Sequence, residues 1–166
     1  QGDKIVVKRV HVNFHELVTQ QKLFFTLDAM GKVDEFQMKT FNAYHVDRNR
    51  LSTDAEVMKY VEKSGLDKKK FTDIYSSFSI QSKLSRASQL MTDYKINGVP
   101  TIAIDGRYMI SPADLFAKTR NQPGDNSHAG LKVMDYFVDK VYKEKNATAA
   151  VIAPAPAPAT KPAPKK

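Results

Sequence analysis

The first stretch of the chain carries the apolar run Ile5-Val6-Val7 and then alternates between polar and apolar residues over positions 9–14. Val10 and Val12 fall on one side of such a segment, and His11 and Asn13 fall on the other. A period of two residues is typical of a β-strand, in which successive side chains point to opposite faces. We therefore expect a strand at 4–14 that buries at least one face.

A helical period of apolar residues replaces this alternation over residues 17–95. A capping box at residues 53–56 begins one helix, which should end at Gly65, and Asp67 should cap the next. We expect several amphipathic helices in this block, and we place Phe24, Phe25 and Phe78 in its core. Four groups of apolar residues recur at helical spacing, and the first group ends at Gly31. The groups are Leu17, Phe24, Leu27 and Met30; Val33, Phe36, Phe41 and Tyr44; Phe71, Ile74, Tyr75 and Phe78; and Leu84, Ala87, Met91 and Tyr94.

A β-hairpin is the sharpest local signal, because residues 101–110 alternate on both sides of Asp105-Gly106. A type I′ turn needs positive φ at both central residues, and an Asp-Gly pair meets that need. Ser111 and Pro112 then provide the N-cap and first residue of a helix. A final amphipathic helix is expected to bury Met134, Phe137, Val138 and Val141.

The composition changes at Asn146, where Ala-rich and then alternating Ala-Pro sequence leads to terminal lysines. Proline lacks an amide donor and favours the polyproline II conformation, so we expect residues 146–166 to form a disordered tail. The 26 Lys and Arg against 18 Asp and Glu leave a net charge of +8. The basic runs at 48–50 and 68–70 are short and flanked by acids, which favours solvated faces and no nucleic-acid partner.

The chain contains no cysteine, which excludes a disulfide, a cysteine nucleophile and a thiolate metal site within it. His11 and His15 are four residues apart, but the first lies in the strand pattern, so they do not form a helical metal pair. His45 and Asp47 lack an accompanying nucleophile. We expect no metal and no cofactor. No apolar run approaches the roughly 20 residues that span a bilayer.

Asn-Gly-Val-Pro-Thr at residues 97–101 immediately precedes the first hairpin strand, where a proline is tolerated because it need not donate to a ladder. Three further features accompany it: Arg-Val-His-Val-Asn-Phe at 9–14, Asp-Gly-Arg-Tyr at 105–108, and the order strand, helical block, hairpin, helix. In these features the chain resembles the DsbA family of thiol:disulfide interchange proteins over residues 4–144.

The resemblance implies an α/β, thioredoxin-like fold with an inserted helical domain. Residues 1–16 and 96–145 would form the thioredoxin-like portion, and residues 17–95 the inserted domain, with 146–166 as the tail. In the family the Val-Pro bond is cis, and its loop pairs with an extended substrate peptide. The substrate-binding residues carried over in this way are Gly98, Val99, Pro100 and Thr101.

The family's Cys-x-x-Cys pair opens a helix that follows the first central strand, and both would precede Lys4. Neither the strand nor the helix is present, so we expect an N-terminally incomplete member that is inactive alone. By resemblance the whole protein is a monomeric periplasmic oxidase of unfolded substrate polypeptides, served by a membrane re-oxidase. It remains open whether this chain should be called an enzyme, because the family is catalytic but the redox cysteines are absent.

Two other function classes stay open at this point. The first is a redox-inactive module that holds extended peptides at the cis-Pro loop. The second is an unrelated basic helical protein that binds nucleic acid or envelope polymers through its body and its Lys-rich tail.

Overall fold

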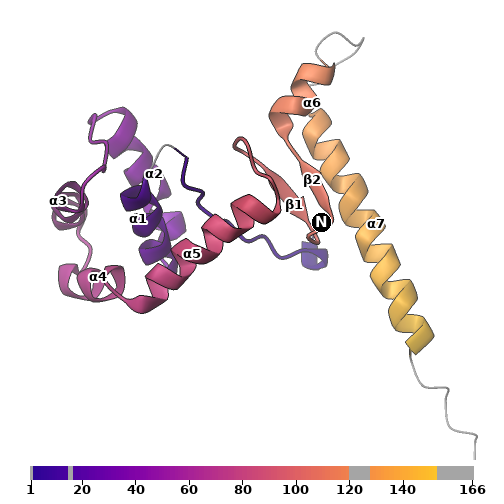
Figure 1. The fold of residues 1–166 in the computed structure, drawn as a ribbon, viewed down its shortest axis with the longest axis horizontal. Helices are drawn as coiled ribbons and strands as arrows, with labels where there is room; N and C mark the ends of the chain where they lie inside the picture. The colour runs from indigo at the N-terminus through magenta and orange to yellow at the C-terminus, as the bar shows by residue number, and fades with distance from the viewer. Residues whose placement is uncertain (1, 15–16, 120–127, 153–166) are drawn as a thin grey trace, which may run out of the picture. The chain divides into compact units, whose positions relative to one another are not determined.

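A computed structural model describes residues 2–14, 17–119 and 128–152 of the chain (Figure 1). The chain divides into two compact units, and we call residues 8–97 the helical unit. The helical unit contains α1 (Val18–Ala29), α2 (Val33–His45), α3 (Asp54–Ser64), α4 (Lys68–Tyr75) and α5 (Phe78–Asp93).

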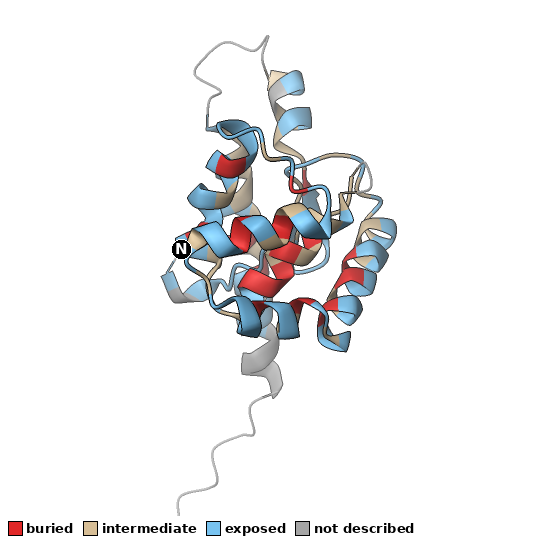
Figure 2. Cartoon of the chain, turned by 90° about the vertical axis from the view of Figure 1, so that its left-hand side faces the viewer, coloured by how far each residue is buried: buried red, intermediate tan, exposed pale blue. Residues whose placement is uncertain are grey.

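The core of the helical unit forms around α1, which packs against each of the other four helices. Leu23 and Leu27 on one side of α1 join a buried cluster with residues of α2, α3 and α4. Phe25, on another side, packs against Ile80 and Leu84 of α5. In Figure 2 buried segments, in red, alternate with exposed ones along the helices. Burial of such a side chain contributes about 1.5–3 kcal/mol, so the apolar stripes account for the helix bundle.

Helix ends in this unit follow the local signals in the sequence. Thr53 accepts a 3.2 Å hydrogen bond from the Glu56 amide, and Asp67 accepts one of 3.0 Å from the Lys70 amide. Gly65 closes α3 with φ of 79°, a conformation that residues with a Cβ rarely adopt. The predicted limits of α3 and the predicted cap of α4 are therefore confirmed.

Phe78 is a correction to the predicted core, because its exposed fraction is 86%. We placed Phe78 on the same helical stripe as Phe71 and Tyr75, which requires all three to lie on one helix. In the structure α4 ends at Tyr75 and a new helix, α5, begins at Phe78. Ser77 caps the new helix by accepting a hydrogen bond from the Ile80 amide. The break changes the helix axis, so Phe78 no longer shares the face of Phe71 and Tyr75.

The second compact unit comprises residues 1–7 and 98–166, and we call it the hairpin unit. Its strands pair antiparallel, with Asp105 (φ 54°) and Gly106 (φ 68°) in the turn, which confirms the predicted hairpin. In Figure 1 the long C-terminal helix lies along this hairpin, and it contacts both strands. The elements are η1 (Gly2–Lys4), β1 (Ile102–Ile104), β2 (Tyr108–Ile110), α6 (Pro112–Thr119) and α7 (Ala129–Ile152).

The strand predicted at 4–14 is wrong. Gly2–Lys4 form a short 3₁₀ turn, and residues 5–13 belong to no regular element. Among the described residues the sheet holds β1 and β2 alone. A strand needs a neighbour to accept and donate its backbone hydrogen bonds, and this segment has none in that part of the chain. Val6 and Val7 accordingly remain 85% and 76% exposed.

The boundary between the units also differs from the predicted one. The structure divides the chain after residue 7 and after residue 97, whereas the sequence placed these boundaries after residues 16 and 95. The first boundary is earlier because the segment before α1 is bound to the helical unit. Gln21 Nε2 donates a 2.7 Å hydrogen bond to the His11 carbonyl.

The predicted tail begins too early, because α7 continues through residues 146–152. This stretch contains no proline and is rich in alanine, the best helix former. The next proline along the chain after the start of α7 is Pro154, and the residue before a proline is disfavoured in the helical conformation. Residues 153–166 lie outside the described part of the chain.

Candidate functional site

The loop before β1 carries the four residues predicted to bind substrate. The Val99–Pro100 peptide bond is cis, as the family resemblance implied. The Thr101 hydroxyl donates a 2.7 Å hydrogen bond to the Gly98 carbonyl, which closes the loop on itself. Val99 is 61% exposed, Pro100 is also exposed, and Gly98 and Thr101 are half-buried. The structure therefore brings these four residues together on one turn that presents an apolar side chain outward.

β1 continues directly from this loop and has one strand neighbour in the sheet, with Ile102 opposite Ile110 and Ile104 opposite Tyr108. Within the described residues the other edge of β1 has no strand partner. An unpaired strand edge presents backbone N–H and C=O groups, and another extended chain can form hydrogen bonds to them.

The hairpin is held against α7 by aromatic and ionic contacts. The rings of Tyr108 and Phe137 stack with centroids 4.3 Å apart, and Ile110 is 4% exposed. At the turn, Lys145 and Arg107 pair with Asp105, and these cations lower the pKa of that carboxyl, Lys145 most. The loop at 98–101 therefore leads directly into a hairpin that is packed against α7.

The histidines do not gather into a site. His11 belongs to the helical unit, and burial lowers its pKa while a contact with the Val12 backbone acts in the other direction. His45 ends α2 with its ring 4.2 Å from that of Phe41. His15 lies outside the described residues. Over the described ranges no cluster of three metal-ligating side chains occurs, and no helix is long and apolar enough to cross a membrane.

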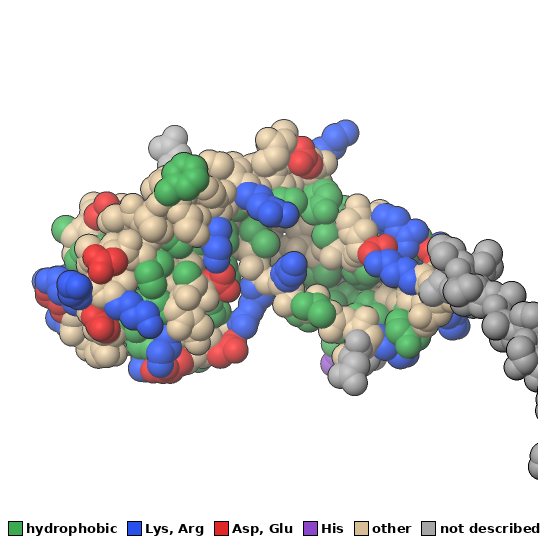
Figure 3. Space-filling view, turned by 90° about the horizontal axis from the view of Figure 1, so that it is seen from below, with side chains coloured by type: hydrophobic (Ala, Val, Ile, Leu, Met, Phe, Trp, Pro, Cys, Tyr) green, Lys and Arg blue, Asp and Glu red, His purple; other side chains and the backbone are tan. Residues whose placement is uncertain are grey.

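Lysines of the helical unit, including one from the basic run at 68–70, pair with acidic residues. Lys68 pairs with Glu62, and Lys32 and Lys39 both pair with Glu35. On the face drawn in Figure 3, Lys and Arg side chains of the helical unit, at the left, stand beside Asp and Glu. Mixed charge of this kind is typical of a solvated surface.

The sequence missed a cavity of about 390 Å³ in the helical unit, between α1, α2 and the segment before α1. Phe24, predicted to be core, lines this cavity, whereas the neighbouring Phe25 is buried as predicted. The residues that line the cavity are spread over positions 9–51. No short pattern along the chain could therefore indicate it.

Comparisons with known proteins agree on one family. Residues 4–122 match the model of the DSBA-like thioredoxin domain. The thiol:disulfide interchange protein DsbA of Burkholderia cepacia is 36% identical over 146 residues, which cover 87% of this chain and 65% of that protein. DsbA of Bordetella parapertussis is 35% identical over 136 residues, covering 81% of this chain and 60% of the relative.

A solved structure is similar as well. The crystal structure of Pseudomonas aeruginosa DsbA matches with a TM-score of 0.64 and 28% identity, over 80% of this chain and 62% of that one. The chain therefore spans between 60% and 65% of the length of these three relatives.

Proposed function

This chain belongs to the DSBA-like thioredoxin domain family, and we propose that it is the substrate-binding portion of a periplasmic thiol:disulfide oxidoreductase. Its fold is the thioredoxin-like α/β fold with an inserted helical domain. The observation that carries the proposal is the loop at 98–101, which presents Val99 outward at the start of an edge strand.

The proposed role of the loop is to hold an extended substrate polypeptide. The main chain of the substrate adds alongside the loop at 98–101, and the exposed Val99 side chain contacts it. The hydrogen bond from Thr101 to the Gly98 carbonyl keeps the loop in one shape before substrate arrives. Backbone pairing is independent of side-chain identity, so this mode suits many unfolded substrates.

Oxidation of the substrate requires sulfur atoms that this chain does not supply. In disulfide exchange a substrate thiolate attacks one sulfur of a disulfide, which forms a mixed disulfide and releases the other sulfur as a thiolate. A second substrate thiolate then attacks the substrate sulfur of the mixed disulfide, which closes the substrate disulfide and releases the remaining original sulfur as a thiolate. The substrate pair is oxidised and the attacked disulfide is reduced. We propose that a Cys-x-x-Cys segment outside these residues provides that disulfide, and that the 166 residues alone catalyse no exchange.

The partners follow from the same proposal. They are unfolded polypeptides with reduced cysteines and a membrane re-oxidase that restores the disulfide, with no nucleic acid, and the protein acts as a monomer. Mixed surface charge on the helical unit supports the absence of a nucleic-acid role.

Peptide binding tests the proposal directly. We expect an extended peptide, with serine in place of its cysteines, to shift the amide NMR resonances of residues 98–104. Val99→Asp should weaken binding about tenfold, because a carboxylate is placed where an apolar contact forms. Val6→Asp is the matched control, since Val6 is also an exposed valine of the same unit. Equal losses in the two variants, or shifts elsewhere only, would contradict the proposal.

A redox-inactive peptide-binding module is the second candidate, and the absence of cysteine from the 166 residues favours it. The two candidates differ in what precedes Gln1 in the coding DNA. An in-frame strand and Cys-x-x-Cys would support the oxidoreductase, and the longer product should then oxidise a reduced dithiol peptide. A longer product without cysteines that still binds the peptide would support the binding module.

A further inference from the structure

A polar groove lies between α2 and α3 of the helical unit, and it shares no lining residue with the cavity beside α1. Its volume of about 720 Å³ falls within the range of ligand sites, roughly 300–1,000 Å³. Ala43 of α2 and Tyr60 of α3 are its buried lining residues. The hydroxyls of Thr40 and Tyr60 lie 2.9 Å apart and form a hydrogen bond, so the two walls of the groove are joined.

Lysines line both walls of this groove. Lys39 of α2 already pairs with Glu35, at 3.6 Å. Lys59 and Lys63 of α3 differ from it, because within the described ranges neither side chain forms an ion pair or a hydrogen bond. These two lysines are four residues apart, so they share one face of α3 and repel each other. An anion bound between them would relieve that repulsion.

The carboxylates of the groove lie near the segment that connects α2 to α3. Glu56, in the first turn of α3, accepts hydrogen bonds from the Ser52 amide at 2.7 Å and the Ser52 hydroxyl at 3.0 Å. These contacts lower the pKa of Glu56 and satisfy its charge within the chain. Asp47, just past the end of α2, is the other carboxylate of the lining. The lysines are further from the connecting segment along both helices, so the groove has a basic part.

The remaining lining residues favour a polypeptide over a nucleotide. Tyr60 is the one aromatic residue among the described residues that line the groove, and it is 7% exposed, so a nucleobase has no open ring to stack on. Arginine is absent from the same lining, so the two-point contact that a guanidinium makes with phosphate is missing. Asn42 and Asn49 instead supply side-chain amides, which pair with peptide groups. Asn49 Oδ1 already accepts from the Leu51 amide, which leaves its NH₂ group to donate.

We propose that this groove binds an extended acidic segment of a polypeptide, with its carboxylates beside Lys59 and Lys63 and its main-chain carbonyls beside Asn42 and Asn49. Charge complementarity selects this occupant, because the two lysines are without partners and the lining is mostly polar. The groove belongs wholly to the helical unit and needs no sulfur chemistry. It therefore stands whether or not the 98–101 loop binds substrate.

Two peptides that differ only in charge test the assignment. Tetraglutamate and tetraglutamine, both with blocked ends, are titrated separately into the ¹⁵N-labelled 166-residue chain near pH 7. Tetraglutamate should shift the amides of Asn42, Lys59 and Lys63 and bind about tenfold more tightly than tetraglutamine, as two or three exposed ion pairs would give. Raising the salt concentration from about 0.05 M to about 0.5 M should remove most of this difference. Equal affinities at low salt would overturn the proposal.

Paired lysine variants separate the groove from the overall positive charge of the chain. Lys59→Gln combined with Lys63→Gln should weaken tetraglutamate binding about fivefold and leave tetraglutamine binding unchanged. Lys69→Gln combined with Lys70→Gln is the matched control, because it removes the same charge from exposed lysines of the helical unit outside the groove lining. Equal losses in the two double variants would show attraction to net charge alone and would overturn the site.

A gain of affinity provides an independent check. Asp47→Asn should strengthen tetraglutamate binding about twofold, because it removes a like charge from the groove lining. Unchanged or weaker binding in this variant would contradict the placement of the peptide.

Tripolyphosphate tests whether any anion suffices. If it shifts the same amides as tightly as tetraglutamate, the lysines form a general anion site and the polypeptide assignment fails; weaker binding supports the assignment. If tetraglutamate shifts none of these amides, the groove proposal fails, and the peptide test at 98–104 is unaffected.

Discussion

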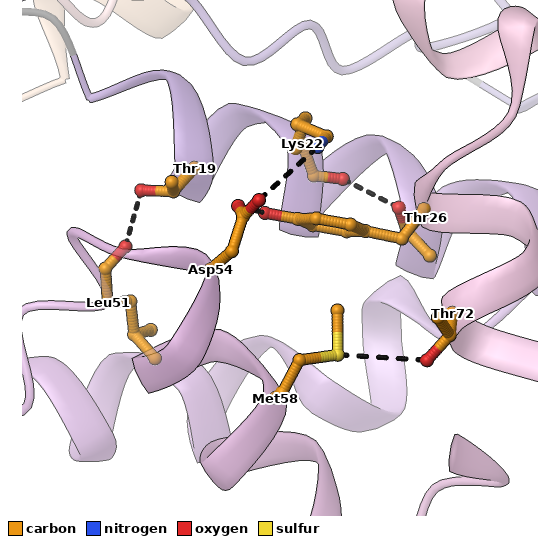
Figure 4. A network of polar contacts seen from close by, with 8 residues as sticks. Thr19, Lys22, Thr26, Leu51, Asp54, Met58 and Thr72 are labelled. Atoms are coloured by element: carbon orange, nitrogen blue, oxygen red, sulfur yellow. Dashed lines mark hydrogen bonds and ion pairs between the residues drawn. The ribbon is translucent and has the colours of Figure 1, made fainter. Parts of the chain in front are cut away.

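The Tyr75 hydroxyl donates a 2.6 Å hydrogen bond to Asp54 Oδ1, and this contact joins the last residue of α4 to the first residue of α3. Lys22 of α1 completes the junction, with its Nζ 3.8 Å from the centre of the Tyr75 ring and 4.0 Å from Asp54 Oδ2. Figure 4 shows Lys22 and Asp54 facing each other across this junction. Three helices are thus connected by one phenol, one carboxylate and one ammonium group.

Removing the phenol oxygen should weaken this junction. We expect Tyr75→Phe to lower the free energy of unfolding by about 1 kcal/mol, because the hydrogen bond is lost while Asp54 stays accessible to water. The ring remains under Lys22, so packing is retained. Urea unfolding followed by circular dichroism measures the change. Tyr142→Phe, at a tyrosine that is 43% exposed, should change it by less than about 0.5 kcal/mol, and equal effects would contradict the assignment.

The same phenol should make the protein sensitive to alkali. Burial raises the pKa of Tyr75 above its ordinary value of 10.0, and the hydrogen bond to Asp54 and the charge of Asp54 add to the shift. A raised pKa stabilises the folded state fully below the unfolded value, and that contribution is lost as the pH rises above it. The free energy of unfolding should therefore fall as the pH rises above about 10, and Tyr75→Phe should reduce the fall. An equal fall in this variant would contradict the prediction.

His11 should produce the opposite dependence in weak acid. Burial depresses its pKa below the ordinary 6.5, so the unfolded chain takes up a proton more readily than the folded one. This contribution to stability is present above pH 6.5 and is lost as the pH falls. The free energy of unfolding should decrease from about pH 7.5 to about pH 5, and less so in His11→Phe. An NMR titration midpoint of the His11 ring at or above 6.5 would contradict this account.

Two glycines should respond to alanine in opposite directions. Gly65 closes α3 with φ of 79°, and no atom would clash with an added Cβ, so backbone strain alone should decide the result. We expect Gly65→Ala to cost about 1 kcal/mol. Gly130 lies within α7 and is equally open, so Gly130→Ala should stabilise the protein by about 0.5–1 kcal/mol. Thermal unfolding of both variants measures the signs, and a shared sign would contradict the explanation.

Local signals in the sequence were sufficient where neighbouring residues determine the conformation. The capped start of α3 at Thr53, the stop at Gly65 and the turn at Asp105-Gly106 all depend on backbone geometry within a few residues. The loop at 98–101 was found instead from the family resemblance, because Val99-Pro100 before an alternating run is a weak signal taken alone. Its role in substrate binding stays a prediction.

Signals that depend on distant partners were not sufficient. The alternation over 4–14 indicated a strand, but a strand forms only where another strand accepts its hydrogen bonds. The helical period through Phe78 predicted a buried side chain on the same helix as Phe71 and Tyr75, but the chain breaks between α4 and α5 before Phe78. For residues 4–14 the strand partner was missing, whereas for Phe78 the N-cap at Ser77 began a new helix.

The sequence by itself determined the capped ends of α3 and α4, the hairpin and the absence of cysteine among these 166 residues, because capping, turn geometry and composition are properties of short segments. The tertiary structure alone decided that residues 8–14 pack with the helical unit, and that Tyr75 meets Asp54. It also decided that a cavity forms where His11 lies beside Phe24. These features join residues far apart in the chain, and their free energy depends on distances that exist only after folding.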